Sequence, residues 1–238
     1  MAQLAISHLI LLHQITRASV PLMKEALEAS RARPDDDVCV ALAPYLERHI
    51  REECFHDQWI LEDLESVGIQ RAQTLSALPS QFVAALVGAQ YYWVLHHHPV
   101  ALIGYMIMLE ANAPTQRLVG HLKAETGLPN SFFRTHLVHA ELDPDHQAEI
   151  LELVDRLPLS PAQDRLIAVS AMHTAECMVD CLANPKSWMQ TFASRKSEFD
   201  YARYRVTASR LNEARSGTVG RQSASIRRAR RGFPSREL

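Results

Sequence analysis

Histidine and carboxylate side chains recur at one spacing in two distant segments of the chain. The pattern H-x3-[E/D]-x2-H occurs in YLERHIREECFHDQW and again in FRTHLVHAELDPDHQAE. Its members are His49, Glu53 and His56 in the N-terminal triplet, and His139, Asp143 and His146 in the C-terminal triplet. On an α-helix, residues i, i+4 and i+7 lie within about 60° of one another. Each triplet therefore places two imidazoles and one carboxylate on one helix face.

The two triplets together predict a metal site. If the two faces meet in a core, they bury four imidazoles and two carboxylates, which is costly unless positive charge lies between them. A pair of divalent metal ions would supply that charge. Mixed imidazole and carboxylate ligands suit iron or manganese. The absence of neighbouring thiolates argues against a structural zinc site. Cys54 follows Glu53 but lies about 100° further round the helix, so it is not counted as a ligand.

A single acid, Glu110, lies in the long apolar run VALIGYMIMLEANAPT between the two triplets. An unpaired carboxylate in a core helix is costly, so we predict that Glu110 bridges the two ions. Either triplet alone would fit a solvated helix face equally well. The metal-site interpretation therefore depends on the three elements completing one another.

The elements that must position these residues are helices. Apolar residues make up 47% of the chain, only eight residues are Gly, and apolar positions recur every three or four residues between clear breaks. The breaks fall at Arg33-Pro34, Gly68, Leu78-Pro79, residues 98–99, Ala113-Pro114, Leu128-Pro129, Leu157-Pro158 and Asn184-Pro185. No segment alternates with period two for long enough to predict a strand. We predict an all-α bundle of seven or eight helices.

One residue conflicts with a continuous helix in the C-terminal triplet. Pro144 lies between Asp143 and His146. Proline cannot donate a hydrogen bond to the carbonyl four residues back. We therefore expect this helix to kink, or to restart with Asp143 near its N-cap.

Charge separates the last part of the chain from the rest. Residues 201–238 hold ten basic and two acidic residues, although the whole chain has a net charge of −2. We predict a helical domain over residues 1–215 and a disordered, Arg-rich tail over residues 216–238, which has too few apolar residues to order itself. The alternative for the tail is an arm that docks on an acidic surface, RNA or a membrane. The overall charge and the absence of a long apolar stretch favour a cytoplasmic protein without nucleic-acid or membrane partners.

The order E-x2-H, isolated Glu, H-x3-D-x2-H resembles that of the heme-oxygenase-like diiron oxidases, which share a helical superfamily with TenA-type thiaminases and PqqC. The resemblance covers roughly residues 40–185, and the combined order is specific although each motif alone is not. It implies a heme-oxygenase-like bundle. It also implies the iron ligands Glu53, His56, Glu110, His139, Asp143 and His146. His49 stands where some members have a Glu, and its role stays open at this point.

The resemblance also implies a function. Family members use two Fe(II) ions to activate O2 and then oxidise small metabolites, by carbon–carbon cleavage, desaturation, N-oxygenation or nitrile formation. We therefore expect a non-heme diiron oxidase or oxygenase that takes O2 as co-substrate, a small-molecule substrate and an external reductant. General likeness to the nitrile-forming branch suggests an aromatic amino acid such as tryptophan.

Three alternatives stay open. A metal-free TenA-like thiaminase or hydrolase would use Cys177 or Cys181 as its nucleophile, but would leave the clustered ligand-type residues unexplained. A heme oxygenase would need a Gly-rich helix over the heme, which eight scattered glycines do not supply. A non-enzymatic helical protein could bind an acidic partner through its Arg-rich tail. A homodimer is also open.

Overall fold

The computed structural model describes residues 1–112 and 114–183. Contacts divide the chain into a compact unit that spans Met1–Phe192 and a second part that spans Ala193–Leu238. The predicted boundary at residues 215 and 216 lies outside the described residues, as does the predicted disordered tail. All that follows concerns the described part of the first unit.

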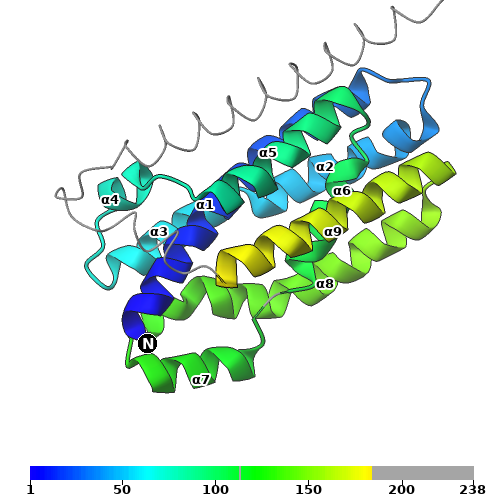
Figure 1. The fold of residues 1–238 in the computed structure, drawn as a ribbon. Coiled ribbons are helices and arrows are strands. Elements are labelled where there is room, and N and C mark those ends of the chain that lie inside the picture. Colours follow the sequence, from blue (N-terminus) through cyan, green and yellow to red (C-terminus); the bar gives the residue numbers. More distant parts are fainter. Residues whose placement is uncertain (113, 184–238) are drawn as a thin grey trace, which may run out of the picture. The chain divides into compact units, whose positions relative to one another are not determined.

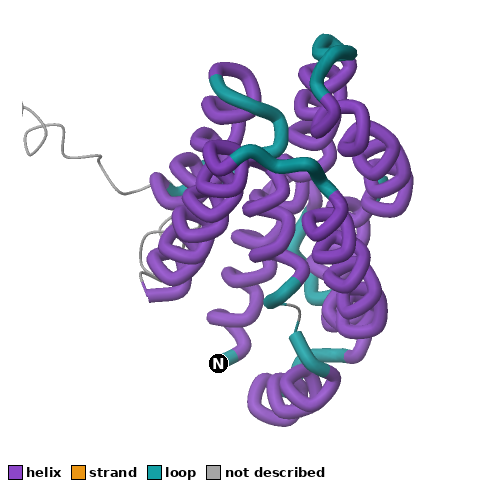
Figure 2. Tube along the Cα trace, turned by 90° about the vertical axis from the view of Figure 1, so that its right-hand side faces the viewer, coloured by secondary structure: helices purple, strands orange, loops and turns teal. Residues whose placement is uncertain are grey.

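Every regular element of the described residues is a helix (Figures 1 and 2). The elements are α1 (Ala2–Arg31), α2 (Asp37–Glu53), α3 (His56–Glu65), α4 (Arg71–Ser76), α5 (Gln81–His96), α6 (Ala101–Glu110), α7 (Gln116–Thr126), the 3-10 helix η1 (Asn130–Phe133), α8 (Arg134–Arg156) and α9 (Pro161–Ala183). Eight of the α-helices in this part of the chain have ten or more residues. The predicted all-α bundle is confirmed.

The helices end where proline and glycine predict that they should. α1 ends shortly before Pro34, α3 before Gly68 and α8 before Pro158. Polar side chains then begin the next helices. The Asp36 side chain accepts hydrogen bonds from the first backbone N–H groups of α2, and Ser80 does the same for α5. The break predicted at residues 184 and 185 lies outside the described residues.

Helix α6 lies in the middle of the bundle and contacts α1, α5, α8 and α9. Its residues from Ala101 to Met106 are all buried. The backbones of α6 and α9 approach most closely at Gly104, where a Cβ atom would collide with the carbonyl oxygen of Ile167 and the backbone nitrogen of Ala171. Glycine is thus required there. This close packing fixes the helix whose last residue is Glu110.

Helix α9 is the described helix that is long and apolar enough to cross a membrane, by length and composition alone. Helices of soluble bundles also meet that test. Ser170 and Thr174 of α9 are buried, and both bond to Gln90 of α5. The Ser170 hydroxyl donates to Gln90 Oε1 over 2.9 Å, and Gln90 Nε2 donates to the Thr174 hydroxyl over 3.4 Å. These bonds tie α9 to the bundle.

The spacing of the N-terminal triplet predicted a single helix, and this prediction is wrong. α2 ends at Glu53, and α3 begins at His56. Between them Cys54 is extended and Phe55 has a left-handed backbone, with φ of 73°. The break allows α2 and α3 to pack against different neighbours, because α3 contacts α4, η1 and α8 in addition to α1.

The C-terminal triplet lies on one unbroken helix, so the restart expected near Asp143 is wrong, whereas the kink expected at Pro144 stays a prediction. α8 runs through Pro144 from Arg134 to Arg156, and Asp143 lies in its interior. Proline removes only one backbone hydrogen bond. Buried residues on both sides of Pro144, among them Thr135 and Ile150, hold the helix against the bundle. Packing therefore outweighs the local loss.

Candidate metal centre

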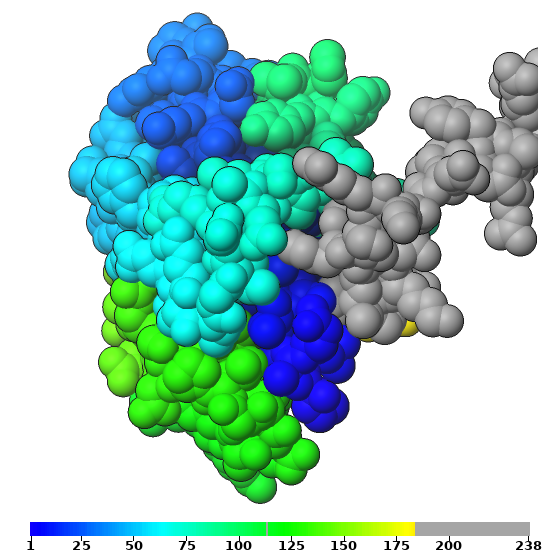
Figure 3. Space-filling view, turned by 90° about the vertical axis from the view of Figure 1, so that its left-hand side faces the viewer, coloured from blue at the N-terminus to red at the C-terminus, as the bar shows by residue number. Residues whose placement is uncertain are grey.

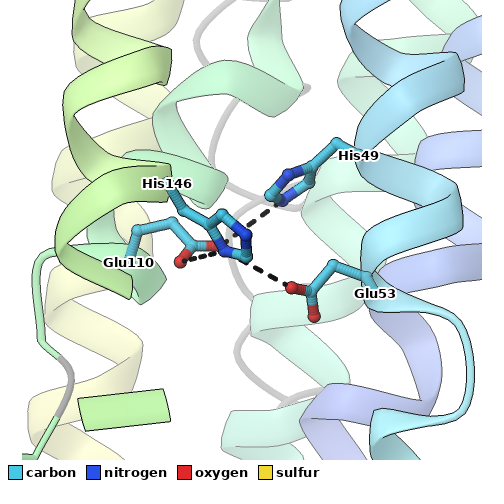
Figure 4. Close-up of side chains that lie close together, drawn as sticks. All are labelled: His49, Glu53, Glu110 and His146. Carbon is cyan, nitrogen blue, oxygen red and sulfur yellow. Dashed lines mark ion pairs between the residues drawn. The ribbon is translucent and has the colours of Figure 1, made fainter. Parts of the chain in front are cut away.

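Four of the predicted ligands meet between α2, α6 and α8 (Figure 4). His49 and Glu53 lie at the end of α2, Glu110 is the last residue of α6, and His146 lies within α8. One nitrogen or oxygen from each residue lies within 4.8 Å of all the others. His49 Nε2 is 3.4 Å from Glu110 Oε1, and His146 Nδ1 is 3.6 Å from Glu110 Oε2. We refer to these four residues as the Glu110 group.

The other three predicted ligands form a second set, the Asp143 group: His56, His139 and Asp143. His139 Nδ1 lies 2.8 Å from Asp143 Oδ1. The rings of His56 and His139 are perpendicular, with centroids 4.9 Å apart. The structure therefore brings four of the seven predicted ligands, including His49, into one group. The other three are linked in pairs, His56 to His139 and His139 to Asp143.

Glu53 joins the two groups. Its Oε2 lies 2.9 Å from His56 Nδ1, and its Oε1 lies 3.6 Å from His146 Nδ1. The direct contacts of Glu110 are with His49 and His146, both in its own group. Among the described residues, Glu53 is thus the carboxylate that touches an imidazole of each group.

The centre has the chemistry that a cation would satisfy. The side chains of His49 and His56 are almost completely buried, and those of Glu53 and Glu110 are nearly so. Glu53 Oε1 and His146 Nδ1 are buried and make no hydrogen bond. Buried polar atoms without partners are rare and destabilising. A metal ion between them would satisfy both, so the residues present fit a metal site.

The ionisation of the Glu110 group also fits a metal site. Burial alone would raise the pKa of Glu110, but the imidazoles of His146 and His49 close to the carboxylate outweigh it and lower that pKa to about 2. The Glu110 carboxylate, 3.6 Å from His146 Nδ1, raises the pKa of His146 to about 9 against the opposing effect of burial. Without metal, a proton on His146 therefore balances the carboxylate charge. A metal ion would take the place of that proton.

The Asp143 group shows the same competition. Burial favours neutral His139, but the hydrogen bond with Asp143 outweighs burial and raises the pKa of His139. Burial raises the pKa of Asp143 in spite of that bond. For Glu53 burial is outweighed by the hydrogen bond with His56, and the pKa falls.

Aromatic residues that orient the ligand rings were not predicted from the sequence. The Tyr45 ring stacks on His49 with centroids 5.4 Å apart, and Trp59 stacks on His56 with centroids 4.1 Å apart. Tyr45 lies one helical turn before His49, so its spacing could have identified it. Glu52, on the outer side, lies 3.5 Å from His49 Nδ1.

Sequence reasoning also missed a small polar group at the other end of α2. Asp36, Cys39 and His98 each offer a ligand atom within 4.8 Å of the others. His98 Nδ1 accepts a hydrogen bond from the Val100 N–H, which leaves the proton on Nε2, 3.0 Å from Asp36 Oδ2. His98 therefore donates to the carboxylate that caps α2, and this group links two loops rather than presenting free ligand atoms.

The fold and the cluster together define a helical bundle with a buried histidine and carboxylate centre. The chain belongs to the family of iron-containing redox enzymes, whose sequence model matches residues 47–178. The matched segment contains all seven predicted ligands.

A solved structure supports the fold. The chain is similar to a domain of unknown function with a heme oxygenase-like fold from Shewanella denitrificans OS217, at 17% identity and a TM-score of 0.70, over 83% of each chain. The predicted heme-oxygenase-like bundle is thereby confirmed. A comparison with curated proteins finds no matching sequence.

Proposed function

We propose that the protein is a non-heme diiron oxidase or oxygenase that uses O2 to oxidise a small metabolite. The observation that carries this proposal is the pairing of two ligand groups through Glu53. One ion requires only one such group, whereas seven buried or partly buried imidazole and carboxylate side chains supply enough donors for two ions with open positions left for O2. Membership of the iron-containing family favours iron over manganese.

Each group has a role in this proposal. His49 and His146 would hold one ion, and His56, His139 and Asp143 would hold the other. Glu53 contacts an imidazole of each group. Glu110 contacts only His49 and His146, so its role as the bridging carboxylate stays a prediction. Two ferrous ions bound there would supply two electrons to O2, and the organic substrate or an external reductant would supply the two more that form water.

The protein's own residues orient the ligands and exclude water. Stacking on Tyr45 and Trp59 limits the rotation of His49 and His56. The buried α6 residues that precede Glu110 exclude solvent from that side of the centre. A dry, fixed set of ligands is what the protein contributes to metal-dependent oxidation.

For the substrate we propose an aromatic amino acid such as tryptophan, with carbon–carbon cleavage, N-oxygenation or nitrile formation as the reaction. The support for this finer proposal is the resemblance to the nitrile-forming branch.

The thiaminase-like alternative finds little support in the cysteine environment. Cys177 Sγ lies 3.5 Å from His173 Nε2. That same nitrogen lies 3.3 Å from the carbonyl oxygen of Ala85, which can only accept, so Nε2 carries the proton and cannot take one from the thiol. Burial also raises the pKa of Cys177, and it raises that of Cys181 to about 11. Neither thiol is activated as a nucleophile.

The test is O2 consumption by the iron-loaded protein. Metal-free protein would be loaded anaerobically with Fe(II), supplied with a reductant and exposed to O2 with a panel of amino acids and fatty acids, while mass spectrometry follows the products. We expect product formation that requires both iron and O2. Products that form at the same rate in a chelator-treated sample would contradict the proposal.

A further inference from the structure

A cavity of about 230 Å³ lies apart from the metal centre, where the N-terminal turns of α1 meet α7, η1 and the start of α8. Figure 3 shows α1 beside α7 on this face of the molecule. Aliphatic and aromatic side chains, such as Leu122, Phe132 and Phe133, form most of its wall. No lining side chain is an acid, a lysine or an arginine. The side chains of the wall therefore offer no charge to a ligand, although Met1 at the N-terminus also lines the cavity.

Two imidazoles and one hydroxyl supply the polarity of the wall: His8, His136 and Thr126. His136 is 8% exposed, and its Nδ1 is buried with no hydrogen-bond partner. The His8 ring faces it with a centroid distance of 6.4 Å, too far for a direct hydrogen bond. A buried nitrogen of this kind is destabilising until a polar group meets it. A ligand in the cavity would supply that group once the His136 ring turns this nitrogen, which has no accessible surface in the structure, toward it.

Both imidazoles are neutral near pH 7. Burial lowers the pKa of His8, and burial together with the nearby His8 and His139 lowers that of His136 to about 4. A neutral imidazole can donate or accept one hydrogen bond but cannot balance a carboxylate. The polar groups of the cavity thus match a neutral partner.

Helix α8 carries residues of both the cavity wall and the metal centre. His136 lies one helical turn before His139, on the same face of the helix. His139 belongs to the Asp143 group. The two residues leave the helix about 4.5 Å apart along its axis, so a molecule that bonds to His136 lies beside a neighbour of a metal ligand.

We propose that this cavity binds the apolar, uncharged end of the organic substrate, and that His136 hydrogen-bonds to a neutral polar group of it. The volume has room for roughly eight non-hydrogen atoms, at the ~30 Å³ that a water molecule occupies in the liquid. An aromatic ring or a short aliphatic chain with one hydroxyl, carbonyl or amine N–H fits that description. That the ligand is the substrate rests on the proposed oxidase function, but its binding to the cavity can be tested without iron.

The first test compares three ligands of nearly equal size and different charge: benzyl alcohol, the benzylammonium ion and benzoate. Their binding to the full metal-free chain would be measured by ligand-observed NMR, with the ¹⁵N imidazole resonances of His136 as the local reporter. We expect benzyl alcohol to bind at least about tenfold more tightly than either ion and to shift the His136 resonances. Equal binding of all three ligands would overturn the proposal.

Two matched variants locate the site. Ala5→Phe fills the cavity from α1, whereas Ala124→Phe adds the same ring on the exposed side of α7 and serves as the control. We expect Ala5→Phe to abolish benzyl alcohol binding and Ala124→Phe to preserve it, with both variants showing the native circular dichroism. Retained binding in a folded Ala5→Phe variant would overturn the assignment.

The role of His136 is tested by His136→Phe, which keeps an aromatic ring in place. The variant should weaken the binding of benzyl alcohol roughly threefold to tenfold and change the affinity for toluene by less than about twofold. Only the alcohol can hydrogen-bond to the imidazole nitrogen. Equal losses for both ligands would contradict the hydrogen bond. This variant is the second line of evidence should Ala5→Phe fail to fold.

Failure of the inference can be told from failure of the proposed function. O2 consumption without binding in the cavity would overturn the inference alone. Binding in the cavity by a protein that takes up no iron would leave the site in place and overturn the oxidase proposal.

Discussion

The two H-x3-[E/D]-x2-H triplets have the same spacing but differ in backbone structure: one is divided between two helices, and the other lies on a single helix. The N-terminal triplet carries no proline, yet its helix breaks at Cys54 and Phe55. The C-terminal triplet contains Pro144, yet its helix is continuous. The spacing predicted which side chains meet, whereas contacts with other helices decided the backbone between them. Local propensity is a weak guide when tertiary packing opposes it.

The contacts of α8 explain why it tolerates the proline. At its start, the Thr135 N–H donates to the buried Asp63 of α3 over 2.8 Å. Beyond the proline, Arg48 of α2 donates to Glu149 over 2.6 Å. The helix is thus held on both sides of Pro144. The segment around Phe55 has no such constraint on helical continuity, because Phe55 itself is 72% exposed.

The largest effect is expected from Glu110→Ala, which removes the carboxylate between the triplets. We expect O2-dependent oxidation to fall by more than about 100-fold, because loss of a ligand exceeds the effect of losing its outer partners. The metal-free fold should survive, since His146 can lose its proton once Glu110 is gone. Steady-state O2 uptake and circular dichroism measure the two effects.

The exposed Glu125→Ala on α7 is the control for Glu110→Ala and should keep both iron and activity. An active Glu110→Ala enzyme with normal iron content would refute the bridging assignment.

The next effect concerns the turn that separates α2 from α3. Phe55→Pro fixes φ near −65°, which is incompatible with the left-handed backbone of 73°. We expect it to displace His56 and to reduce bound iron to about one ion per chain. Phe55→Gly, which adopts this backbone freely, should keep both ions and change the free energy of unfolding by less than about 1 kcal/mol. Iron analysis measures the bound ions of both variants, and thermal unfolding measures their stability. Full iron binding by Phe55→Pro would show that the turn does not position His56.

A smaller effect is expected at Pro144. Pro144→Ala restores the backbone N–H within α8 and should stabilise the protein by about 1–2 kcal/mol, since part of the ~3 kcal/mol helix gain is offset in the unfolded chain. Iron stoichiometry should stay the same, because the helix is already continuous. Denaturant unfolding measures the change. A gain in bound iron without added stability would instead indicate that the proline distorts the ligand positions.

The smallest effect is a release of protons on metal binding. The pKa of His146 is raised to about 9 without metal, so at pH 7 its imidazole carries a proton that iron must displace. Glu110, with a pKa lowered to about 2, is already ionised and releases none. We expect Fe(II) titration in weak buffer to release at least about one proton per chain at pH 7, and fewer as the pH rises above about 9. Proton release that is the same in His146→Ala would show that another group supplies it.

The sequence predicted the helical bundle, the helix ends marked by proline and glycine, and the residues that gather between the helices, because helical periodicity, proline breaks and side-chain chemistry are all local properties. It did not predict the end of α2 at Glu53. It could not predict the left-handed Phe55, since that backbone results from the packing of α3 against α8. Nor could it reveal that Glu53 touches both groups, because the α2–α3 turn sets the direction of that carboxylate. The cavity at His136 needed the structure too, as its wall comes from helices distant in sequence.

The most direct test of the central claim is the iron stoichiometry of the chain and of variants that remove one ligand from each triplet. Metal-free protein, His49→Ala and His139→Ala would be loaded anaerobically with Fe(II), freed of excess metal and analysed for iron per chain. We expect two ions in the native chain and about one or fewer in each variant. One ion or none in the native chain, or two ions in both variants, would contradict a centre built jointly by the two triplets.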